Sequence, residues 1–533
     1  MRGLPWIIVA LLLSLCAAKG IWFTRGLTVP DDPDTIRDLG FIQGILDGNL
    51  AGDPSSGGAW RWYPPLVHAV AAAVIHLFAL EPMPAWTQAG GWLNLLSPLM
   101  FFLMNRRLLG PWPACAATAV FVLFNSSLMA GDEAAGYTPW TLTPALSWPL
   151  FFGAVWLIAA RAESAKWRDA VLIGAMMGIV FLCHTVPALL LAAIVTAAVV
   201  AAHGLTWGVL LWLAAAAVTE LMVAAPFLGP LIWVYHLHIA NPVPGAWVHE
   251  MMEPAAFFTR TAFLNLPGVL ALIWLGVARR SSRVSASTAI LGAWVLVCLL
   301  FLGRHYVCAA AAPEDGVCHI FVIAPHHYHV YLQAAWASLI GVALGSMRWR
   351  PPVLALAGAA ALAGAIQFLH RPGADAPWAG APVQPDAILD QDAYAWILHQ
   401  TSPGDLFVTP LPEARDQMGA AAATVIAAGR RLAAPPEIHA NPYLAWRPLN
   451  ARRLEWLAAA ETGDAASLCH FATAAAPAAA FLLLPSANAA AAGPLRAVLR
   501  TRTHTVLRLD GTVCDGATIV ALRQTPQTPP ESP

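Results

Sequence analysis

The chain has 533 residues, of which 58% are hydrophobic and only 11% are charged. Soluble domains carry about 25% charged residues, so this composition excludes an ordinary soluble protein and indicates that lipid solvates most of the chain. The formal net charge of −1 at pH 7 gives no reason to expect nucleic acid as a partner.

Repeated apolar runs have the length of roughly 17–25 residues that a helix needs to cross a hydrocarbon core of about 30 Å. The first resembles a secretory signal, but Ala17-Ala18-Lys19 is a poor cleavage site, so we interpret it as an uncleaved helix. The predicted spans lie near 4–23, 86–104, 112–130, 140–160, 169–183, 185–202, 207–230, 266–279, 287–303, 328–346 and 352–369.

Charge decides whether the remaining apolar stretch, 64–80, also crosses. Short basic loops prefer the cytoplasm. The chain has four such loops after residue 100, and all four lie on the cytoplasmic side only if one apolar helix before residue 100 does not cross. The stretch 64–80 is short and begins at Pro64-Pro65, so we place it along the outer interface. The sequence therefore predicts a polytopic, mainly α bundle of about eleven spans with a cytoplasmic N-terminus. Lys19 and Arg25, at the outer end of the first helix, do not follow this charge rule.

The amino-acid composition changes after the predicted helix bundle, which covers residues 1–370. Residues 371–384 have the Pro- and Gly-rich composition of a linker, and the Pro-rich tail 525–533 is predicted to be disordered. Between them, 385–524 predicts a small soluble α/β domain on the outer face. Its predicted helices are 386–401, 415–428 and 451–461, and its predicted strands are 405–409, 480–484, 505–509 and 518–523.

The eight cysteines divide into two groups. Cys16, Cys115, Cys183 and Cys298 lie within or beside apolar spans, where a thiol behaves as a small hydrophobic group. The others form two pairs in predicted outer segments, Cys308/Cys318 and Cys469/Cys514. An oxidising compartment would allow both pairs to form disulfides, and the alternative is four free thiols.

The first outer loop, 24–85, holds the strongest cluster of polar residues. Asp31, Asp32 and Asp34 follow the end of the first helix within a few residues. Asp32 fits a helix N-cap and Pro33 fits the first helical position, so capping explains one carboxylate. Catalysis is the alternative reading for the cluster, and the residues alone leave the two interpretations open.

The same loop resembles the GT-C glycosyltransferases, which include protein mannosyltransferases, oligosaccharyltransferase subunits and lipid A aminoarabinose transferases. The resemblance rests on an acidic residue after the first span, then Ile45-Leu46-Asp47-Gly48, then Tyr63-Pro64-Pro65-Leu66 at the start of a surface helix. It implies an inverting transferase with a polyprenyl-phosphate-linked sugar donor. The family's catalytic aspartate corresponds to Asp34, and to Asp31 or Asp32 if the register shifts.

The family also has an acidic site after the third span, and Asp132 and Glu133 lie at that point here. In such a reaction a carboxylate removes the proton of the acceptor, and cationic groups face the phosphate leaving group. The candidates for phosphate binding are Arg260, Arg304, His326 and His327. No cofactor is certain. Asp34 with Asp132 or Glu133 could hold Mg²⁺ or Mn²⁺.

The histidine run His326-His327-Tyr328-His329 has two other interpretations. It matches no standard zinc spacing, although His305 and His319 are near in sequence, and it could consist of plain interfacial histidines. Gly429-Arg430-Arg431 and Asn441-Pro442-Tyr443 in the C-terminal domain could touch an acceptor, but we expect turns and packing there.

The sequence departs from known relatives because it lacks a Trp-Trp-Asp-type motif, which argues against transfer to asparagine. Its expected partners are the lipid-linked donor, a lipid, glycan or protein acceptor, and membrane lipids. The Ala-rich, Arg-over-Lys composition suggests a GC-rich bacterium, so we expect an inner-membrane protein with a periplasmic C-terminal domain. The alternative is a transporter or assembly protein for surface polysaccharide, although its spans should then carry more ionisable residues.

Overall fold

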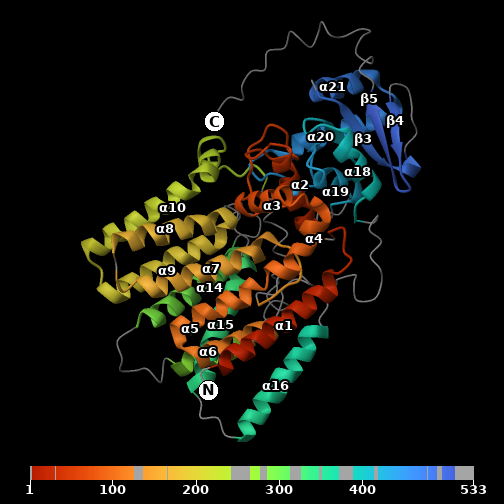
Figure 1. Cartoon of the computed structure of the whole chain (residues 1–533). Coiled ribbons are helices and arrows are strands. Elements are labelled where there is room, and N and C mark those ends of the chain that lie inside the picture. Colours follow the sequence, from red (N-terminus) through yellow and green to blue (C-terminus); the bar gives the residue numbers. More distant parts are fainter. Residues whose placement is uncertain are drawn as a thin grey trace. The chain divides into compact units, whose positions relative to one another are not determined.

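The computed structural model describes most of the chain and is mainly helical (Figure 1). The described residues are 3–30, 32–124, 136–164, 166–241, 265–275, 285–311, 326–346, 351–370, 388–412, 418–476, 478–488 and 495–509. The chain divides into two compact units. The bundle unit is Met1–Pro30, Arg61–His238 and Pro242–Val383, and the second unit is Asp31–Trp60, Ile239–Asn241 and Gln384–Pro533.

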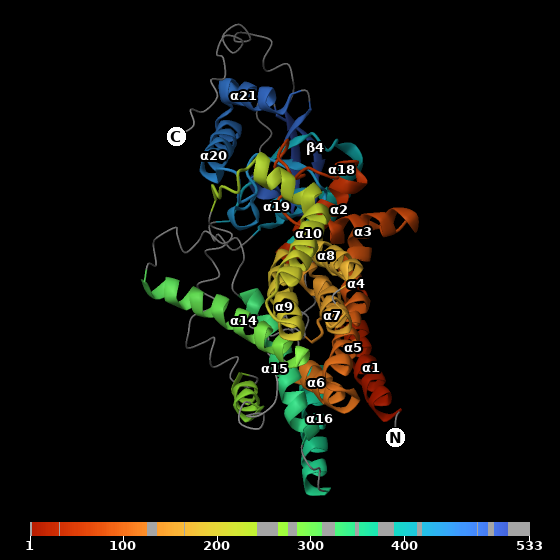
Figure 2. The same ribbon diagram turned by 90° about the vertical axis from the view of Figure 1, so that its left-hand side faces the viewer.

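The described residues of the bundle unit are mainly helical (Figure 2). Their bounds are α1 Leu4–Thr24, α3 Leu66–Leu77, α4 Pro82–Leu93, α5 Leu96–Leu109, α6 Pro111–Leu123, α7 Thr143–Arg161, α8 Trp167–Cys183, α9 Thr185–His203, α10 Trp207–Trp233, α14 Ala286–Ala311, α15 His326–Ser346 and α16 Pro351–His370. A further apolar helix covers Asn265–Leu275. Each predicted span therefore overlaps helical structure, and residues 125–130 and 276–279 of two spans lie outside the described residues.

The predicted number of spans is only partly supported. Among the described residues, five helices are long and apolar enough to cross a membrane: α1, α7, α9, α10 and α14. The predicted span 86–104 is divided between α4 and α5, which Asn94 and Leu95 separate. The chain therefore has the apolar helices of a membrane protein, while the count of about eleven is not established.

Helix α3 is the apolar stretch that the charge pattern places on the surface. It has 12 residues, which corresponds to about 18 Å and falls short of a hydrocarbon core of about 30 Å. It bends by 117° from the α4–α5 segment that follows. Val70, Val74 and Leu77 are exposed along it. These features agree with a helix that lies along an interface.

Aromatic rings and small residues pack the bundle core. Phe101 of α5 stacks on Phe121 of α6 with ring centroids 4.1 Å apart, and Phe152 of α7 meets both rings edge-on. Gly174 of α8 lies so close to α10 that an added Cβ would be 2.2 Å from the Ala216 carbonyl oxygen. Such close backbone contact between helices is typical of membrane bundles, where van der Waals packing replaces the hydrophobic effect.

The second unit is a mixed sheet with helices on both faces. In its described residues the strand order is β2-β1-β3-β5-β4, with β1 parallel to β2 and β3, and β5 antiparallel to β3 and β4. The strands are β1 Leu406–Val408, β2 Arg431–Leu432, β3 Ala480–Pro485, β4 Leu495–Arg500 and β5 His504–Leu509. The helices are α2 Pro33–Leu46, α18 Gln391–Gln400, α19 Ala420–Ala427, α20 Trp446–Thr462 and α21 Ala465–Ala475, with 3₁₀ turns η3 Glu437–His439 and η4 Ser486–Asn488.

Alternating side chains on the strands separate the two faces. Trp456 of α20 and Phe471 of α21 pack with Leu482 of β3 on one face. On the other face, Phe407 stacks on Phe481 at 5.0 Å, and Trp396 of α18 meets Phe481 edge-on at 5.9 Å. The described residues between 388 and 509 thus contain a small sheet with helices, as the pattern of the sequence predicts.

Three of the four predicted strands are confirmed, and the fourth, 518–523, lies outside the described residues. The sequence did not predict β2, β4 or α21. Cys469 is disulfide-bonded, which is what the predicted pair Cys469/Cys514 requires of Cys469. Cys318, Cys514 and the side chain of Cys308 are not described. Cys16, Cys115, Cys183 and Cys298 are free and buried, as expected for thiols in apolar spans.

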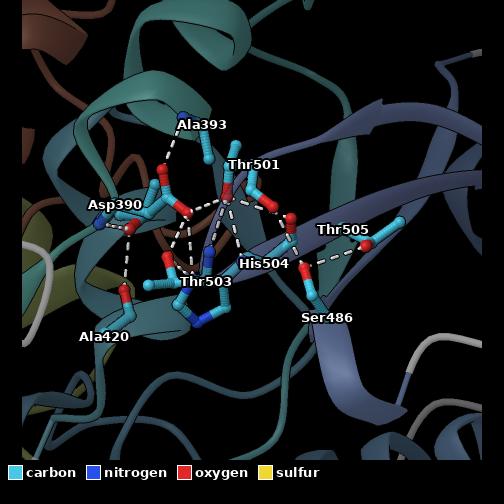
Figure 3. A network of polar contacts seen from close by, with 9 residues as sticks. Asp390, Ala393, Ala420, Ser486, Thr501, Thr503, His504 and Thr505 are labelled. Carbon is cyan, nitrogen blue, oxygen red and sulfur yellow. Dashed lines mark hydrogen bonds and ion pairs between the residues drawn. The ribbon is translucent and has the colours of Figure 1, made fainter.

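A buried polar network joins α18 to the turn between β4 and β5 (Figure 3). Asp390 caps α18, because its Oδ1 accepts from the backbone N–H of Ala393 at 2.9 Å. Its Oδ2 accepts from three groups at the turn: Thr501 Oγ1, Thr503 Oγ1 at 2.6 Å and His504 Nδ1 at 3.1 Å. Burial alone would raise the pKa of Asp390, but the side-chain hydrogen bonds hold the pKa below its ordinary value.

Replacing Asp390 by Ala is expected to destabilise the second unit by about 2 kcal/mol or more, because the change removes a helix cap and several charge-assisted hydrogen bonds. The stabilisation is present when Asp390 is ionised, so the wild type should lose it as the pH falls below about 4. The melting temperature of the full chain in detergent, measured between pH 6 and pH 3, checks both points. Asp392→Ala, an exposed neighbour, is the control. An unchanged pH dependence in Asp390→Ala would contradict this assignment.

Candidate active site

Asp32 and Asp34 of the first loop lie at the start of helix α2. Asp32 is its N-cap, and its Oδ1 accepts from the backbone N–H groups of Asp34 at 2.8 Å and Thr35 at 3.0 Å. Pro33 follows at the start of the helix. Asp32 therefore has the capping role that the sequence predicts, and Asp31 lies outside the described residues.

Asp34 lies in the first turn of α2, and its side chain is 47% exposed. Its Oδ1 accepts from Arg37 Nη1 at 2.7 Å. Arg37 also donates to Asp38 Oδ1, from Nη2 at 2.9 Å and from Nε at 3.2 Å, so its guanidinium lies between two carboxylates. Within the described part of the chain, Oδ2 of Asp34 has no hydrogen-bond partner. One oxygen of Asp34 is therefore fixed and the other is open.

A third neighbour of Asp34 comes from the C-terminal part of the same unit. His439 Nδ1 is 3.6 Å from Asp34 Oδ1, and the His439 side chain is 9% exposed. Burial lowers the pKa of His439 to about 4, the Asp34 carboxylate opposes this shift, and the Arg37 charge adds to it. The imidazole is therefore neutral at pH 7. No signal in the sequence identifies His439, because a single histidine far along the chain has no recognisable spacing to Asp34.

Close packing holds α2 against α19. Gly40 lies so near Ile426 that an added Cβ would be 2.2 Å from the Ile426 carbonyl oxygen. At the end of α2, Asp47 Oδ2 accepts from Arg430 Nη1 at 2.6 Å, and Asp47 Oδ1 accepts from Gln43 Nε2 at 2.9 Å. The first-loop helix is therefore bound to the C-terminal domain at both points.

Arg430 is 2% exposed and has a full set of partners. Besides Asp47 it donates to Thr401 Oγ1 at 3.1 Å and to three carbonyl oxygens, those of Ala428 at 2.8 Å, Thr401 at 3.1 Å and Leu398 at 3.3 Å. The expectation that Gly429-Arg430-Arg431 serves turns and packing fits this geometry, although the sequence did not show that Arg430 pairs with the first loop.

Several other predicted site residues fall outside the described structure. Asp132, Glu133 and Arg260 are not described, and neither is the side chain of His326. The predictions for these residues stay predictions. Arg304 of α14 and His327 of α15 are described, and both lie in the bundle unit.

His327 belongs to a group of rings around the start of α15. Its ring centroid is 4.8 Å from that of His184, which occupies the N-cap position of α9. The next residue, Tyr328, stacks on Phe301 of α14 at 4.3 Å. His329 is buried and contacts Gln333 one turn along the helix. The histidine run is therefore packed against α9 and α14.

The described residues contain no cluster of three or more His, Cys, Asp or Glu side chains that could hold a metal ion. Around Asp34 the described titratable neighbours are Arg37, Asp38 and His439, and the Arg37 cation already compensates the carboxylates. These described side chains do not by themselves form a divalent-metal site.

No family model and no curated protein sequence matches the chain. The structure is nevertheless similar to ArnT from Cupriavidus metallidurans bound to undecaprenyl phosphate, with a TM-score of 0.57 and 13% identity over 96% of this chain and 99% of that protein. It is also similar to the Archaeoglobus fulgidus oligosaccharyltransferase tethered to an acceptor peptide, with a TM-score of 0.51 and 12% identity over 91% of this chain and 69% of that one.

A third similar structure is the arabinofuranosyltransferase AftD from Mycobacteria, with a TM-score of 0.54 and 14% identity. The match covers 93% of this chain but 41% of AftD, so the chain spans less than half of that protein. All three are GT-C glycosyltransferases, and the resemblance seen in the first loop is confirmed at the level of the fold. The chain has the fold of the GT-C membrane glycosyltransferases.

Proposed function

We propose that this chain is a membrane glycosyltransferase that moves a sugar from a polyprenyl-phosphate donor to an acceptor hydroxyl, with Asp34 as general base. The observation that carries the proposal is the state of the Asp34 carboxylate. Arg37 Nη1 donates to Oδ1 of Asp34 at 2.7 Å, whereas Oδ2 has no hydrogen-bond partner among the described residues. The Asp34 side chain is 47% exposed. A fixed, accessible carboxylate at this place can take a proton from a bound hydroxyl.

The proposed reaction is a direct displacement. The acceptor oxygen attacks the anomeric carbon of the sugar, and its proton passes to Oδ2 of Asp34. The bond from the anomeric carbon to the phosphate oxygen breaks, and the lipid phosphate leaves with the electron pair. The anomeric configuration is inverted, and Asp34 later returns its proton to water.

The leaving phosphate needs positive charge or hydrogen-bond donors as its charge develops. Arg304, beside Tyr328 in the bundle unit, and His327, beside His184, are the described candidates. Arg260 and His326 complete the set proposed from the sequence. ArnT is bound to undecaprenyl phosphate in its structure, and the archaeal oligosaccharyltransferase to a dolichol phosphate, which supports a polyprenyl phosphate as the lipid here.

We place the reaction on the outer face of the membrane, with the N-terminus in the cytoplasm and the C-terminal domain in the periplasm of a bacterium. The disulfide at Cys469 supports this orientation, because disulfides persist in oxidising compartments and are rare in the cytosol. Alkylation of introduced cysteines by a membrane-impermeant reagent in spheroplasts would test the orientation.

The experiment for the proposed reaction uses purified full-length chain with a panel of radiolabelled polyprenyl-phosphate sugars and membrane extract as acceptor. We expect one donor to lose its sugar to an acceptor with release of the lipid phosphate. Absence of turnover with every donor, together with donor-independent export of surface polysaccharide, would instead support a transporter or assembly protein.

The same assay tests the proposal of a divalent ion held by Asp34 with Asp132 or Glu133. Loss of turnover in EDTA with recovery in Mg²⁺ or Mn²⁺ would support that ion, since carboxylates suit such hard cations. Full activity in EDTA would leave proton removal by Asp34 as the role of the first-loop site.

A further inference from the structure

His439 is held next to Asp34 by a segment that has little freedom to move. Three side chains fix this segment: Asn241 Nδ2 donates to the Glu437 carbonyl oxygen at 3.1 Å, Asn441 Nδ2 to the Trp60 carbonyl oxygen at 3.3 Å, and Trp446 Nε1 to the Pro435 carbonyl oxygen at 2.7 Å. Asn241 and Asn441 are both buried. Residues 435–443 are therefore fixed from three different parts of the sequence.

Further backbone contacts strengthen the same segment. The backbone N–H groups of Ala240 and Asn241 both donate to the Pro442 carbonyl oxygen at 2.9 Å. Asn441 Oδ1 accepts from the backbone N–H of Tyr443 at 3.0 Å, which closes a turn directly after η3. An imidazole placed in this way is set before substrate arrives, as preorganised catalytic groups are.

The imidazole approaches the oxygen of Asp34 that Arg37 already holds. Its Nδ1 is 3.6 Å from Asp34 Oδ1, which is longer than a normal hydrogen bond. Catalytic hydrogen bonds in substrate-free structures are often long and shorten in the complex. The groups from α2 that face His439 are Asp34, Arg37 and Asp38, two anions and one cation.

A neutral imidazole suits this place better than a second cation. Arg37 already compensates the charge of Asp34, and a further positive charge would favour the ionised carboxylate and weaken it as a base. A neutral N–H group can orient Oδ1 and exclude water with a much smaller effect on basicity. Oδ2 then stays available for the acceptor proton.

We infer that His439 is a positioning residue for the Asp34 general base, supplied to the site by the C-terminal domain. This inference rests on the proposed function. It assigns that domain a part in the chemistry, since the segment that carries His439 lies between β2 and α20.

Paired substitutions at residue 439 separate positioning from packing. The side-chain amide of Asn places an N–H near the position of Nδ1, whereas that of Gln places it near Nε2. We therefore expect His439→Asn to keep most of the kcat, and His439→Gln and His439→Leu to lose about 10–100-fold in kcat with little change in the donor KM. His439→Lys should move the acid limb of the kcat profile to lower pH and lower its plateau.

The same changes at His399, an exposed histidine of α18, are the matched controls and should leave kcat unchanged. Equal losses in His439→Asn and His439→Leu, or losses confined to the donor KM, would overturn the positioning role. Thermal melting of each variant identifies one that fails to fold.

A double-mutant cycle is the readout that does not depend on activity. The shifts in melting temperature of Asp34→Ala and His439→Leu should be non-additive, because each change removes the contact between the two side chains. Additive shifts would overturn the inference even in an active enzyme. A non-additive cycle in a chain that turns over no donor would overturn the proposed function while the contact itself stands.

Discussion

Asp34→Asn is expected to lower the kcat for sugar transfer by about 10²–10⁴-fold, the range for removal of a positioned general base. The amide keeps the size of the side chain and an oxygen that can accept from Arg37, so the donor KM should change little. Arg37 then retains Asp38 as an anionic partner, with its Nη2 2.9 Å from Asp38 Oδ1, and the start of α2 should stay folded. Initial rates with a single labelled donor, measured across donor concentrations, give both constants.

Asp32→Asn is the matched control for this prediction. Asn is as good an N-cap as Asp, so the hydrogen bonds to the Asp34 and Thr35 N–H groups can be kept and kcat should remain near that of the wild type. If Asp34→Asn turned over donor as fast as the wild type, the general base would have to be Asp31 or Asp32. A decline of both variants to the same level would indicate damage to the start of α2.

Much of the local structure around this site could be predicted from the sequence. Asp32 followed by Pro33 is a helix-start signal that depends only on neighbouring residues, and α2 begins there. The apolar runs of the sequence located the bundle helices, because a run of roughly 17–25 apolar residues is typical of a helix solvated by lipid. The break between α4 and α5 was missed, since nothing in the apolar pattern of 86–104 separates an interrupted helix from a continuous one.

The partners of the site residues could not be predicted in the same way. His439 and Arg430 reach α2 from the other end of the chain, and no spacing rule connects residues so far apart. Strand β2 has 2 residues and gives no alternating pattern, yet it is the element that directly follows Arg430. These contacts result from tertiary packing, for example the close approach of Gly40 to Ile426, which a sequence without an alignment does not reveal.

The second large effect is expected from the pair Asp47–Arg430, which connects the end of α2 to the C-terminal domain at 2.6 Å. Arg430→Met removes the cation and leaves Asp47, 19% exposed, with Gln43 as its remaining hydrogen-bond donor among the described side chains. Breaking a buried ion pair in this way costs about 3–5 kcal/mol. We expect a lower melting temperature of the full chain in detergent and faster hydrogen exchange in α2.

Asp47→Asn should cost less, because the Asn oxygen can still accept from Arg430 and the guanidinium keeps Thr401 and the nearby carbonyl groups as partners. Arg452→Met, at an exposed position of α20, is the control and should change neither quantity. Because α2 carries Asp34, Arg430→Met should also lower kcat at temperatures where the chain is still folded. Faster exchange in the sheet with unchanged exchange in α2 would mean that Arg430 stabilises its own domain and does not position the catalytic helix.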